Sequence, residues 1–412
     1  MKRKILKFAG LILGLALGLA FTGIAESAPP IKIGETSEWD YPGGQGTKRG
    51  VEMAIKEINA TGGLLGRKVE GIYYDNKVDP NEAKNATERL LYKDKVDVIC
   101  GFWRSDLAIV AQPLVMEAKK ILLIGGAGTP VVTSERIKKD YKTYKYTFTT
   151  TSNVLALASE QGVTEALKLG MSKIALLVEK AAWCDPWFDF WSKKYAGKIV
   201  SSNRFSPTAT DFSVEFAQAK AAGADILFFV SSGRGGTPSV KQWYDMRIPA
   251  VYVGYNLDAQ DPNFAKVSEG KCQGVATAKV GGVTGLPITK KSLPYYNEYK
   301  KVYGELPIAY TNGVAYDAVM AWAHGVKLAG TVETEAVVKA MERKDFNYEG
   351  VCGVIEYFDE VHNPVGGGWA KGEPWGWVGL QWQDGKQVIF WPKNIKAGDM
   401  IIPDWVKKLR GK

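Results

Sequence analysis

Histidine and cysteine are scarce in this chain of 412 residues, which has two histidines and four cysteines. None of the cysteines is in a CxxC motif, so a zinc site, which draws mainly on Cys and His ligands, has almost no support. The sequence also lacks GxSxG, Walker A and HExxH motifs. These absences remove the usual signatures of nucleophilic and metal-assisted hydrolysis. We therefore expect no catalytic residue, no metal and no cofactor.

Long hydrophobic runs are confined to the N-terminus, where basic residues precede an apolar stretch from Phe8 to Phe21. Small residues at positions 23 and 25 follow this stretch, so the pattern predicts a secretory signal peptide over residues 1–25, cleaved after Ala25. An uncleaved anchor is the alternative, but the run is shorter than the ~20 residues needed to span a bilayer. No later stretch predicts a membrane span.

Outside the basic N-terminus and the terminal Lys407-Lys408-Leu409-Arg410, charge of one sign is not concentrated, although the formal net charge is +9. The lysine pairs are scattered, which indicates solvated surface and no nucleic-acid partner. An oxidising compartment permits disulfides. Cys272 with Cys352 is the pairing that we expect if a disulfide forms, and buried thiols are the alternative.

The stretch Ile31–Asp79 predicts a strand–helix–strand unit. Ile31–Gly34 alternates in hydrophobicity as a strand does. Apolar residues then recur at i, i+3, i+4 and i+7 from Val51 to Ile58, the spacing of one helix face. Val69–Tyr74 predicts the second strand. The aromatic, glycine-rich loop after the first strand lies at the edge where parallel sheets bind ligands.

Alternating strands and helices continue to residue 149, and a second series of the same kind runs from Ser152 to Val253. The restart indicates two similar α/β lobes rather than one large sheet. A block of helices and then late strands follow, including a hairpin turned at Asp384-Gly385. The chain is therefore expected to return and finish both lobes, crossing between them at Thr149–Ser152 and Gly281-Gly282.

Several motifs together resemble the periplasmic solute-binding proteins of the leucine/isoleucine/valine-binding type, which serve ATP-driven uptake systems. The motifs are IKIG, RGVEMAIKEINATGGLLGRKVE with YYDNKVDP, VDVICG, GGAGTP, VGYN, YTNGVAYDAVMAWA and FDEVHNPVGG. The resemblance covers nearly the whole mature chain. It implies the type I periplasmic binding fold, with two Rossmann-like lobes of mostly parallel sheets joined by a three-stranded hinge.

The same resemblance implies how the chain is divided and where it works. Residues 31–149 and 282–356 would form lobe 1, and residues 150–281 and 357–412 would form lobe 2. The protein would be a periplasmic monomer that closes on a small-molecule ligand and then docks on the membrane permease of an ABC transporter. No reaction is required.

Two single residues and one loop carry over from the family's ligand site. Ser105 matches a hydroxyl that holds the ligand carboxylate at a helix N-terminus, with a plain helix cap as the alternative. The loop with Gly126, Ala127 and Thr129 matches one that supplies further donors, with an ordinary turn as the alternative. Trp183 stands where the family packs an aromatic ring on the ligand, although it could instead belong to the core.

Other candidates come from their place in loops after predicted strands. The aromatic residues Trp39, Tyr41 and Trp103 would face the cleft or shield the lobe core. The loop Gly254–Asp258 adds three candidates, which are Tyr255, Asn256 and Asp258.

The charges in these loops indicate the class of ligand. Amino-acid-binding members have an acidic residue where this sequence has Asn256, and an amide cannot form the stronger charge-assisted bond. Asp258 could substitute for it. Arg104 and Arg234 suit bidentate carboxylate recognition. We therefore expect an organic or aromatic acid, with an amino acid as the alternative.

Other functions have less support in the sequence than transport. The same lobes could present the bound state to a membrane receptor, as a ligand-sensing protein does. A secreted hydrolase lacks its signature, and the run from Gly44 to Gly50 misses the third glycine of a dinucleotide fingerprint because position 49 is Arg. Asp359, Glu360 and His362 form the only carboxylate cluster with a histidine, and their flanking residues predict a turn.

Overall fold

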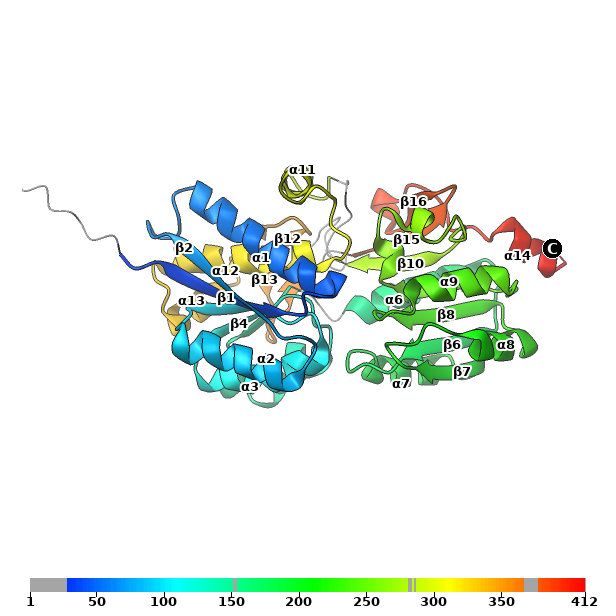
Figure 1. The fold of residues 1–412 in the computed structure, drawn as a ribbon, viewed down its shortest axis with the longest axis horizontal. Coiled ribbons are helices and arrows are strands. Elements are labelled where there is room, and N and C mark those ends of the chain that lie inside the picture. Colours follow the sequence, from blue (N-terminus) through cyan, green and yellow to red (C-terminus); the bar gives the residue numbers. More distant parts are fainter. Residues whose placement is uncertain (1–27, 151–153, 281–283, 285–286, 367–376, 412) are drawn as a thin grey trace, which may run out of the picture.

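A computed structural model describes residues 28–150, 154–280, 284, 287–366 and 377–411. Two α/β lobes lie side by side along the long axis of the molecule (Figure 1). The predicted signal peptide lies outside the described residues, as do most of the predicted crossovers at 149–152 and 281–282. Within the described part of the chain, no helix combines the length and hydrophobicity of a membrane span.

Lobe 1 is built on a five-stranded parallel sheet with the strand order β2-β1-β3-β4-β5. The strands are β1 (Ile31–Ser37), β2 (Val69–Asp75), β3 (Val98–Gly101), β4 (Ile121–Ile124) and β5 (Thr147–Thr149). The three central strands are buried almost throughout, as expected for a parallel sheet covered on both faces. Their carboxyl ends all point toward lobe 2 (Figure 1).

Helices from distant parts of the sequence cover this sheet. The earlier ones are α1 (Pro42–Ala60), α2 (Pro80–Glu88) and α3 (Ser105–Glu117); the later ones are α11 (Ser292–Tyr303), α12 (Thr311–Ala329) and α13 (Thr334–Met341). Helices α1 and α12 pack so closely that a Cβ on Gly50 would lie 2.3 Å from the carbonyl oxygen of Asn312. Glycine at this position therefore permits the close approach of the two backbones.

Lobe 2 is built on a four-stranded parallel sheet with the order β7-β6-β8-β9. The strands are β6 (Ile174–Glu179), β7 (Ile199–Phe205), β8 (Ile226–Ser231) and β9 (Val251–Asn256). Alternate residues enter two separate apolar clusters, Leu176 and Phe228 on one face and Leu177 and Phe229 on the other. The first face is covered by α6 (Val154–Lys168) and α7 (Asp185–Lys194), the second by α8 (Ser213–Ala221) and α9 (Gly236–Asp245).

The C-terminal part of the chain returns to lobe 2. β10 (Ala276–Val280), β15 (Trp377–Gln383) and β16 (Lys386–Trp391) form an antiparallel sheet, and α14 (Asp404–Leu409) follows. The predicted hairpin turn has positive φ angles of 49° at Asp384 and 73° at Gly385. This conformation is the one that an Asp-Gly pair favours in two-residue hairpins.

Short elements complete the two lobes. In lobe 1 they are η1 (Arg89–Lys93), η2 (Val131–Glu135), α4 (Arg136–Lys139), α5 (Tyr141–Tyr144), β11 (Tyr348–Glu349), β12 (Val354–Ile355), β13 (Tyr357–Phe358) and β14 (Pro364–Val365). In lobe 2 they are η3 (Asp258–Gln260), α10 (Phe264–Val267) and η4 (Lys393–Ile395).

Two features differ from the sequence-based expectations. The segment Tyr357–Val365 packs on β5 of lobe 1, where Phe358 and His362 contact the ring of Phe148. The predicted boundary after residue 356 assigns that segment to lobe 2. None of the four cysteines forms a disulfide, and Cys272 and Cys352 are buried in the cores of different lobes. The expected Cys272–Cys352 pairing is therefore wrong.

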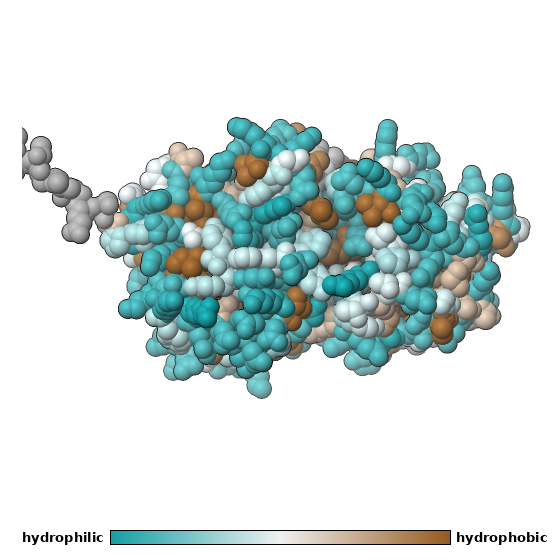
Figure 2. Space-filling view, viewed as in Figure 1, coloured by the Kyte–Doolittle hydropathy of each residue, from teal (hydrophilic) through white to brown (hydrophobic). Residues whose placement is uncertain are grey.

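The surface shown in Figure 2 is mostly hydrophilic, and hydrophobic side chains appear there as separate small patches. Scattered apolar side chains of this kind are ordinary on a soluble surface. The candidate binding site is therefore the cavity between the lobes and not a surface patch.

Candidate functional site

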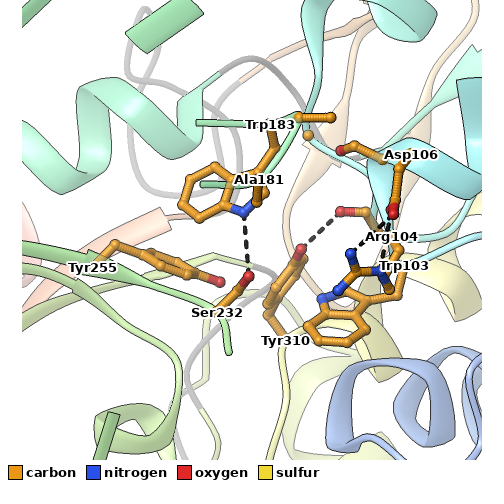
Figure 3. Close-up of a pocket in the computed structure, with 12 residues that line it drawn as sticks. Trp103, Arg104, Asp106, Ala181, Trp183, Ser232, Tyr255 and Tyr310 are labelled. Atoms are coloured by element: carbon orange, nitrogen blue, oxygen red, sulfur yellow. Dashed lines mark hydrogen bonds and ion pairs between the residues drawn. The ribbon is translucent and has the colours of Figure 1, made fainter. Parts of the chain in front are cut away.

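A cavity lies between the carboxyl ends of the two parallel sheets. Both lobes line it (Figure 3). Its wall consists of Trp103, Arg104, Ser105, Asp106, Gly126, Gly128 and Tyr310 from lobe 1, and Ala181, Ala182, Trp183, Ser232 and Tyr255 from lobe 2. The cavity lies at the edge that the strand–helix–strand pattern predicts for ligand binding.

Ser105 supplies an uncommitted polar group to the cavity. It is the first residue of α3, a helix of 13 residues, and only 4% of its surface is exposed. Its hydroxyl oxygen is buried and has no hydrogen-bond partner in the structure. The first-turn N–H groups of a helix and its dipole favour a negative charge at this end. The position is therefore suited to a carboxylate.

Arg104 and Asp106 flank Ser105 and bind each other. The Arg104 guanidinium donates from Nε to Asp106 Oδ1 over 3.1 Å and from Nη2 to Oδ2 over 2.9 Å. Burial lowers the pKa of Arg104, but Asp106, Glu38 and Glu179 together raise it above its ordinary value. Because the bidentate face of Arg104 is occupied by Asp106, it is not available to a ligand carboxylate in this arrangement.

Four of the nine remaining wall residues are aromatic. Trp103 and Tyr310 lie on the lobe 1 side, and Trp183 and Tyr255 face them from lobe 2 (Figure 3). The Tyr310 hydroxyl donates to the carbonyl of Gly126 over 2.7 Å, and Trp183 packs edge-on against Tyr255 with centroids 5.3 Å apart. These contacts fix the rings around a space suited to a flat or apolar body.

Two buried glutamates lie beneath the lobe 1 half of the site, at the end of β1 and just after it. Burial raises the pKa of Glu35 to about 8 and that of Glu38 to about 7. Glu35 accepts hydrogen bonds from Ser37 and from Trp39, whereas one carboxyl oxygen of Glu38 has no partner. Both carboxyl groups are therefore easily protonated near neutral pH.

The structure brings six of the sequence-predicted site residues into the cavity wall: Trp103, Arg104, Ser105, Gly126, Trp183 and Tyr255. Four others lie close by without lining it. Trp39 binds Glu35, Ala127 is wholly buried, and the Thr129 hydroxyl accepts from the N–H of Val131. Tyr41 packs on Trp103, with ring centroids 5.8 Å apart.

The three remaining candidates belong to lobe 2 and have other partners. The guanidinium of Arg234 lies 5.9 Å from the centre of the Tyr41 ring, which belongs to lobe 1. Asp258 accepts from the N–H and the hydroxyl of Thr237, both over 2.8 Å, at the start of α9. The Asn256 amide donates to Gly236 O and Tyr252 Oη, both over 3.0 Å.

The position of Asn256 follows from the length of β9. The sequence pattern predicts a strand that ends at Val253, but β9 continues to Asn256. Successive side chains of a strand point to opposite faces. Tyr255 therefore points into the cavity, and Asn256 points away from it.

Sequence reasoning did not single out six wall residues: Asp106, Gly128, Ala181, Ala182, Ser232 and Tyr310. All but Asp106 and Tyr310 lie in loops that follow predicted strands. The sequence therefore predicts which loops reach the site, but not which residues of each loop line it. Tyr310 lies just before α12 rather than after a strand, where the rule for parallel sheets does not apply.

The described residues contain no group of three or more His, Cys, Asp and Glu side chains placed to hold a metal ion. The site therefore offers hydrogen-bond donors, aromatic faces and one internal ion pair. These groups can bind a small carboxylic acid.

Comparison with known proteins gives consistent results. Residues 34–370 match the model of a family described as periplasmic binding protein. A Leu/Ile/Val-binding protein homolog 7 from Brucella melitensis is 24% identical over 424 residues, which cover 95% of this chain and 99% of that protein.

Solved structures show the same fold. The branched-chain amino acid transporter substrate binding protein LivJ from Streptococcus pneumoniae, in complex with isoleucine, has a TM-score of 0.73 at 23% identity and covers 87% of this chain and 97% of its own. A solute binding protein from R. palustris in complex with benzoate has a TM-score of 0.71 at 17% identity, with coverages of 91% and 98%. Another from Rhodopseudomonas palustris BisB5, in complex with 3,4-dihydroxy benzoic acid, has a TM-score of 0.72 at 23% identity, with coverages of 90% and 98%.

Proposed function

The chain belongs to the periplasmic binding protein family, whose members are not enzymes, and from this we propose that it is the substrate-binding component of an ABC uptake transporter. Its ligand is a small carboxylic acid with an aromatic or apolar body. The observation that carries this proposal is the buried, unpartnered Ser105 hydroxyl at the N-terminus of α3, surrounded by aromatic rings.

The carboxylate would bind at lobe 1. Ser105 can donate one hydrogen bond, and the first turn of α3 can add backbone N–H donors. Hydrogen bonds to a charged group contribute about 1.5–3 kcal/mol each, more than neutral ones. The ligand charge would therefore be held without any basic side chain, which agrees with the pairing of Arg104 to Asp106.

The body of the ligand would lie against both lobes. Trp103 from lobe 1 and Trp183 from lobe 2 present aromatic surface to the same space. A ligand that contacts both lobes stabilises the closed arrangement by its differential affinity for that state. Capture therefore needs only hinge bending and no reaction.

The ligands of the similar structures support the class of solute. Isoleucine, benzoate and 3,4-dihydroxy benzoic acid all carry a carboxylate. The four aromatic rings of the wall favour an aromatic acid. The only acidic wall residue is Asp106, which binds Arg104, so a ligand ammonium would meet no uncommitted carboxylate in the wall. An amino acid is the alternative ligand.

The remaining parts of the proposal follow from the family. The protein would act in the periplasm after removal of residues 1–25, and it would deliver its ligand as a monomer to a membrane permease.

A thermal-shift screen with matched pairs of ligands tests the proposal. Benzoate and benzamide differ by the carboxylate charge, and isoleucine and isoleucinamide differ in the same way. A ligand at 100 times its Kd stabilises by about 2.7 kcal/mol, which raises the Tm by roughly 5–10 °C. We expect an acid, and not its amide, to give this shift. Equal shifts from acid and amide, or no shift from any acid, would contradict carboxylate capture.

A further inference from the structure

Glu179 is a fully buried carboxylate at the end of β6, directly behind the lobe 2 wall of the cavity. Four donors surround its two oxygens. Oε1 accepts from the indole N–H of Trp183 over 2.9 Å and from the hydroxyl of Ser232. Oε2 accepts from the hydroxyl of Ser231 over 3.2 Å and from the N–H of Gly233 over 2.9 Å. The two carboxyl oxygens of Glu179 offer about four lone-pair sites, so they can accept from all four donors.

This arrangement decides what Trp183 can offer to a ligand. Its single N–H is shared between Glu179 and the Ser232 oxygen, which lies 3.2 Å away (Figure 3). Indole nitrogen has no second hydrogen and accepts none. Trp183 can therefore present only its ring surface to the cavity.

The same arrangement decides the polarity of Ser232. A serine hydroxyl has one hydrogen and two lone pairs. The hydrogen of Ser232 points to Glu179, and one lone pair faces the indole N–H of Trp183. Because Ser232 lines the cavity, its remaining lone pair is available there. Ser232 therefore acts as an acceptor and cannot also donate.

The two lobes thus offer opposite polarity. Ser105 of lobe 1 has no partner for its hydroxyl and sits at a helix N-terminus, so it can donate to a carboxylate. Ser232 of lobe 2 can only accept. A ligand that satisfies both needs an acidic group toward lobe 1 and a hydrogen-bond donor toward lobe 2.

We propose that Glu179 is a positioning residue that holds Ser232 as an acceptor, so that the site selects carboxylic acids carrying a hydroxyl or ammonium donor over analogues without one. The inference rests on the proposed function and adds the class of solute. A polar group left unpaired on binding loses affinity, which is how a fixed acceptor discriminates between such ligands.

Titration calorimetry on the purified protein tests this with pairs of probes. Benzoate is compared with 3-hydroxybenzoate and 4-hydroxybenzoate, and 3-methylpentanoate is compared with isoleucine. The first set measures the effect of a hydroxyl donor on affinity, and the second measures the effect of an ammonium donor. In the unmodified protein we expect at least one donor-bearing acid to bind about tenfold more tightly than its partner.

Three variants test which residues cause the preference for acids that carry a donor. Ser232→Ala removes the acceptor, so the preference should fall to about one. Glu179→Gln places an amide N–H₂ against two of the four donors and frees the Ser232 hydroxyl, so the preference should fall too.

Asp225→Asn is the matched control. Asp225 is also a buried lobe 2 carboxylate, and it accepts from the N–H groups of Ser172 and Lys173 over 2.9 and 2.7 Å. It does not line the cavity. Its variant should keep the preference.

The outcomes separate this inference from the proposed function. Acids that bind equally with and without a donor, or a preference that survives Ser232→Ala, would overturn the inference and leave carboxylate capture standing. A preference lost in Ser232→Ala but kept in Glu179→Gln would overturn the role of Glu179. Binding of no carboxylic acid at all would overturn both. Because the readout is a ratio of affinities within each variant, a general loss of stability does not produce it.

Discussion

Ser105 is the residue on which the proposed carboxylate binding most directly depends. Replacing it by alanine removes one hydrogen bond to a charged group, a loss of about 1.5–3 kcal/mol. We therefore expect Ser105→Ala to weaken binding of the carboxylic acid found in the screen by roughly 10- to 150-fold, with little change in urea unfolding. Calorimetry measures the affinity.

Ser292→Ala is the control for this variant. Ser292 is a buried serine of the same lobe whose hydroxyl donates to the carbonyl of Val351 over 2.8 Å, away from the cavity. It should bind the acid normally. An equal loss of affinity in both variants would mean that Ser105 acts only through the stability of lobe 1.

Glu35 makes the stability of the folded protein depend on pH. Burial raises its pKa from 4.5 to about 8, so between these values the folded state holds a proton that the unfolded chain releases. Stability therefore falls as pH rises from about 4.5 to about 8. Glu35→Gln cannot ionise, so we expect the variant to gain stability relative to the unmodified protein across this range.

Urea unfolding at pH 5, 6, 7 and 8 measures the effect. Glu88→Gln, at an exposed position of α2, should run parallel to the unmodified protein. A Glu35→Gln curve that also ran parallel would show that Glu35 is ionised in the folded state at all these values.

At the scale of single residues, the sequence predicted the kind of loop better than the direction of each side chain. Trp183 and Tyr255 came from loops that the pattern marked, and both line the cavity. Asn256 does not line the cavity. The strand runs three residues longer than expected, and the alternation of side chains along it turns the Asn256 amide away from the cavity. A shift of one residue along a strand exchanges the two faces, and hydrophobicity alone cannot detect it where both faces are buried.

At the scale of secondary-structure elements, the edge strand β5 is held by the segment Tyr357–Val365. The ring of His362 stacks on Phe148 with centroids 4.1 Å apart, and its Nδ1 lies 3.0 Å from the carbonyl of Thr147. Its Nε2 lies 3.0 Å from Oε1 of Glu342, and its carbonyl accepts from the N–H of Thr149 over 3.2 Å. One side chain therefore joins three parts of lobe 1.

We expect His362→Ala to lower the free energy of unfolding by roughly 2–4 kcal/mol, because it leaves a cavity and removes two buried hydrogen bonds. Urea denaturation measures this. His324→Ala is the natural comparison, since His324 is the only other histidine and is less buried. A loss no larger than that of His324→Ala would contradict a structural role for the segment.

The long elements were predictable, and the short ones were not. The two βα series and the Asp384-Gly385 hairpin have periodicity and turn residues that local physics fixes. β13 and β14 have two residues each, too few to show any period. Their assignment to lobe 1 depends on contacts with Phe148, a residue more than 200 positions earlier in the sequence. No local sequence pattern contains that information.

At the scale of the whole molecule, Arg234 and Tyr41 form a contact between the lobes. The Arg234 guanidinium of lobe 2 lies over the Tyr41 ring of lobe 1, which packs on Trp103 of the cavity wall. An exposed cation–π contact contributes about 0.5–1 kcal/mol. Because it exists only when the lobes approach, we expect Arg234→Gln to weaken ligand affinity two- to fivefold without changing the stability of either lobe.

Arg247→Gln provides a matched comparison. Arg247 lies over the rings of Tyr244 and Trp405, all within lobe 2, so its loss should leave affinity unchanged. Calorimetry with the same acid compares the two variants. Equal affinities for Arg234→Gln and the unmodified protein would show that this contact does not contribute to closure.

The packing of α1 on α12 has a consequence for how the protein is made. Tyr316 of α12 donates to Glu57 of α1, although the two residues are 259 positions apart in the chain. Synthesis proceeds from the N-terminus, and domains generally fold as units. Lobe 1 is thus begun first and finished after most of lobe 2 has been made. Until the chain has been made as far as residue 329, the face of α1 that α12 covers lacks its partner helix, and lobe 1 cannot complete its packing.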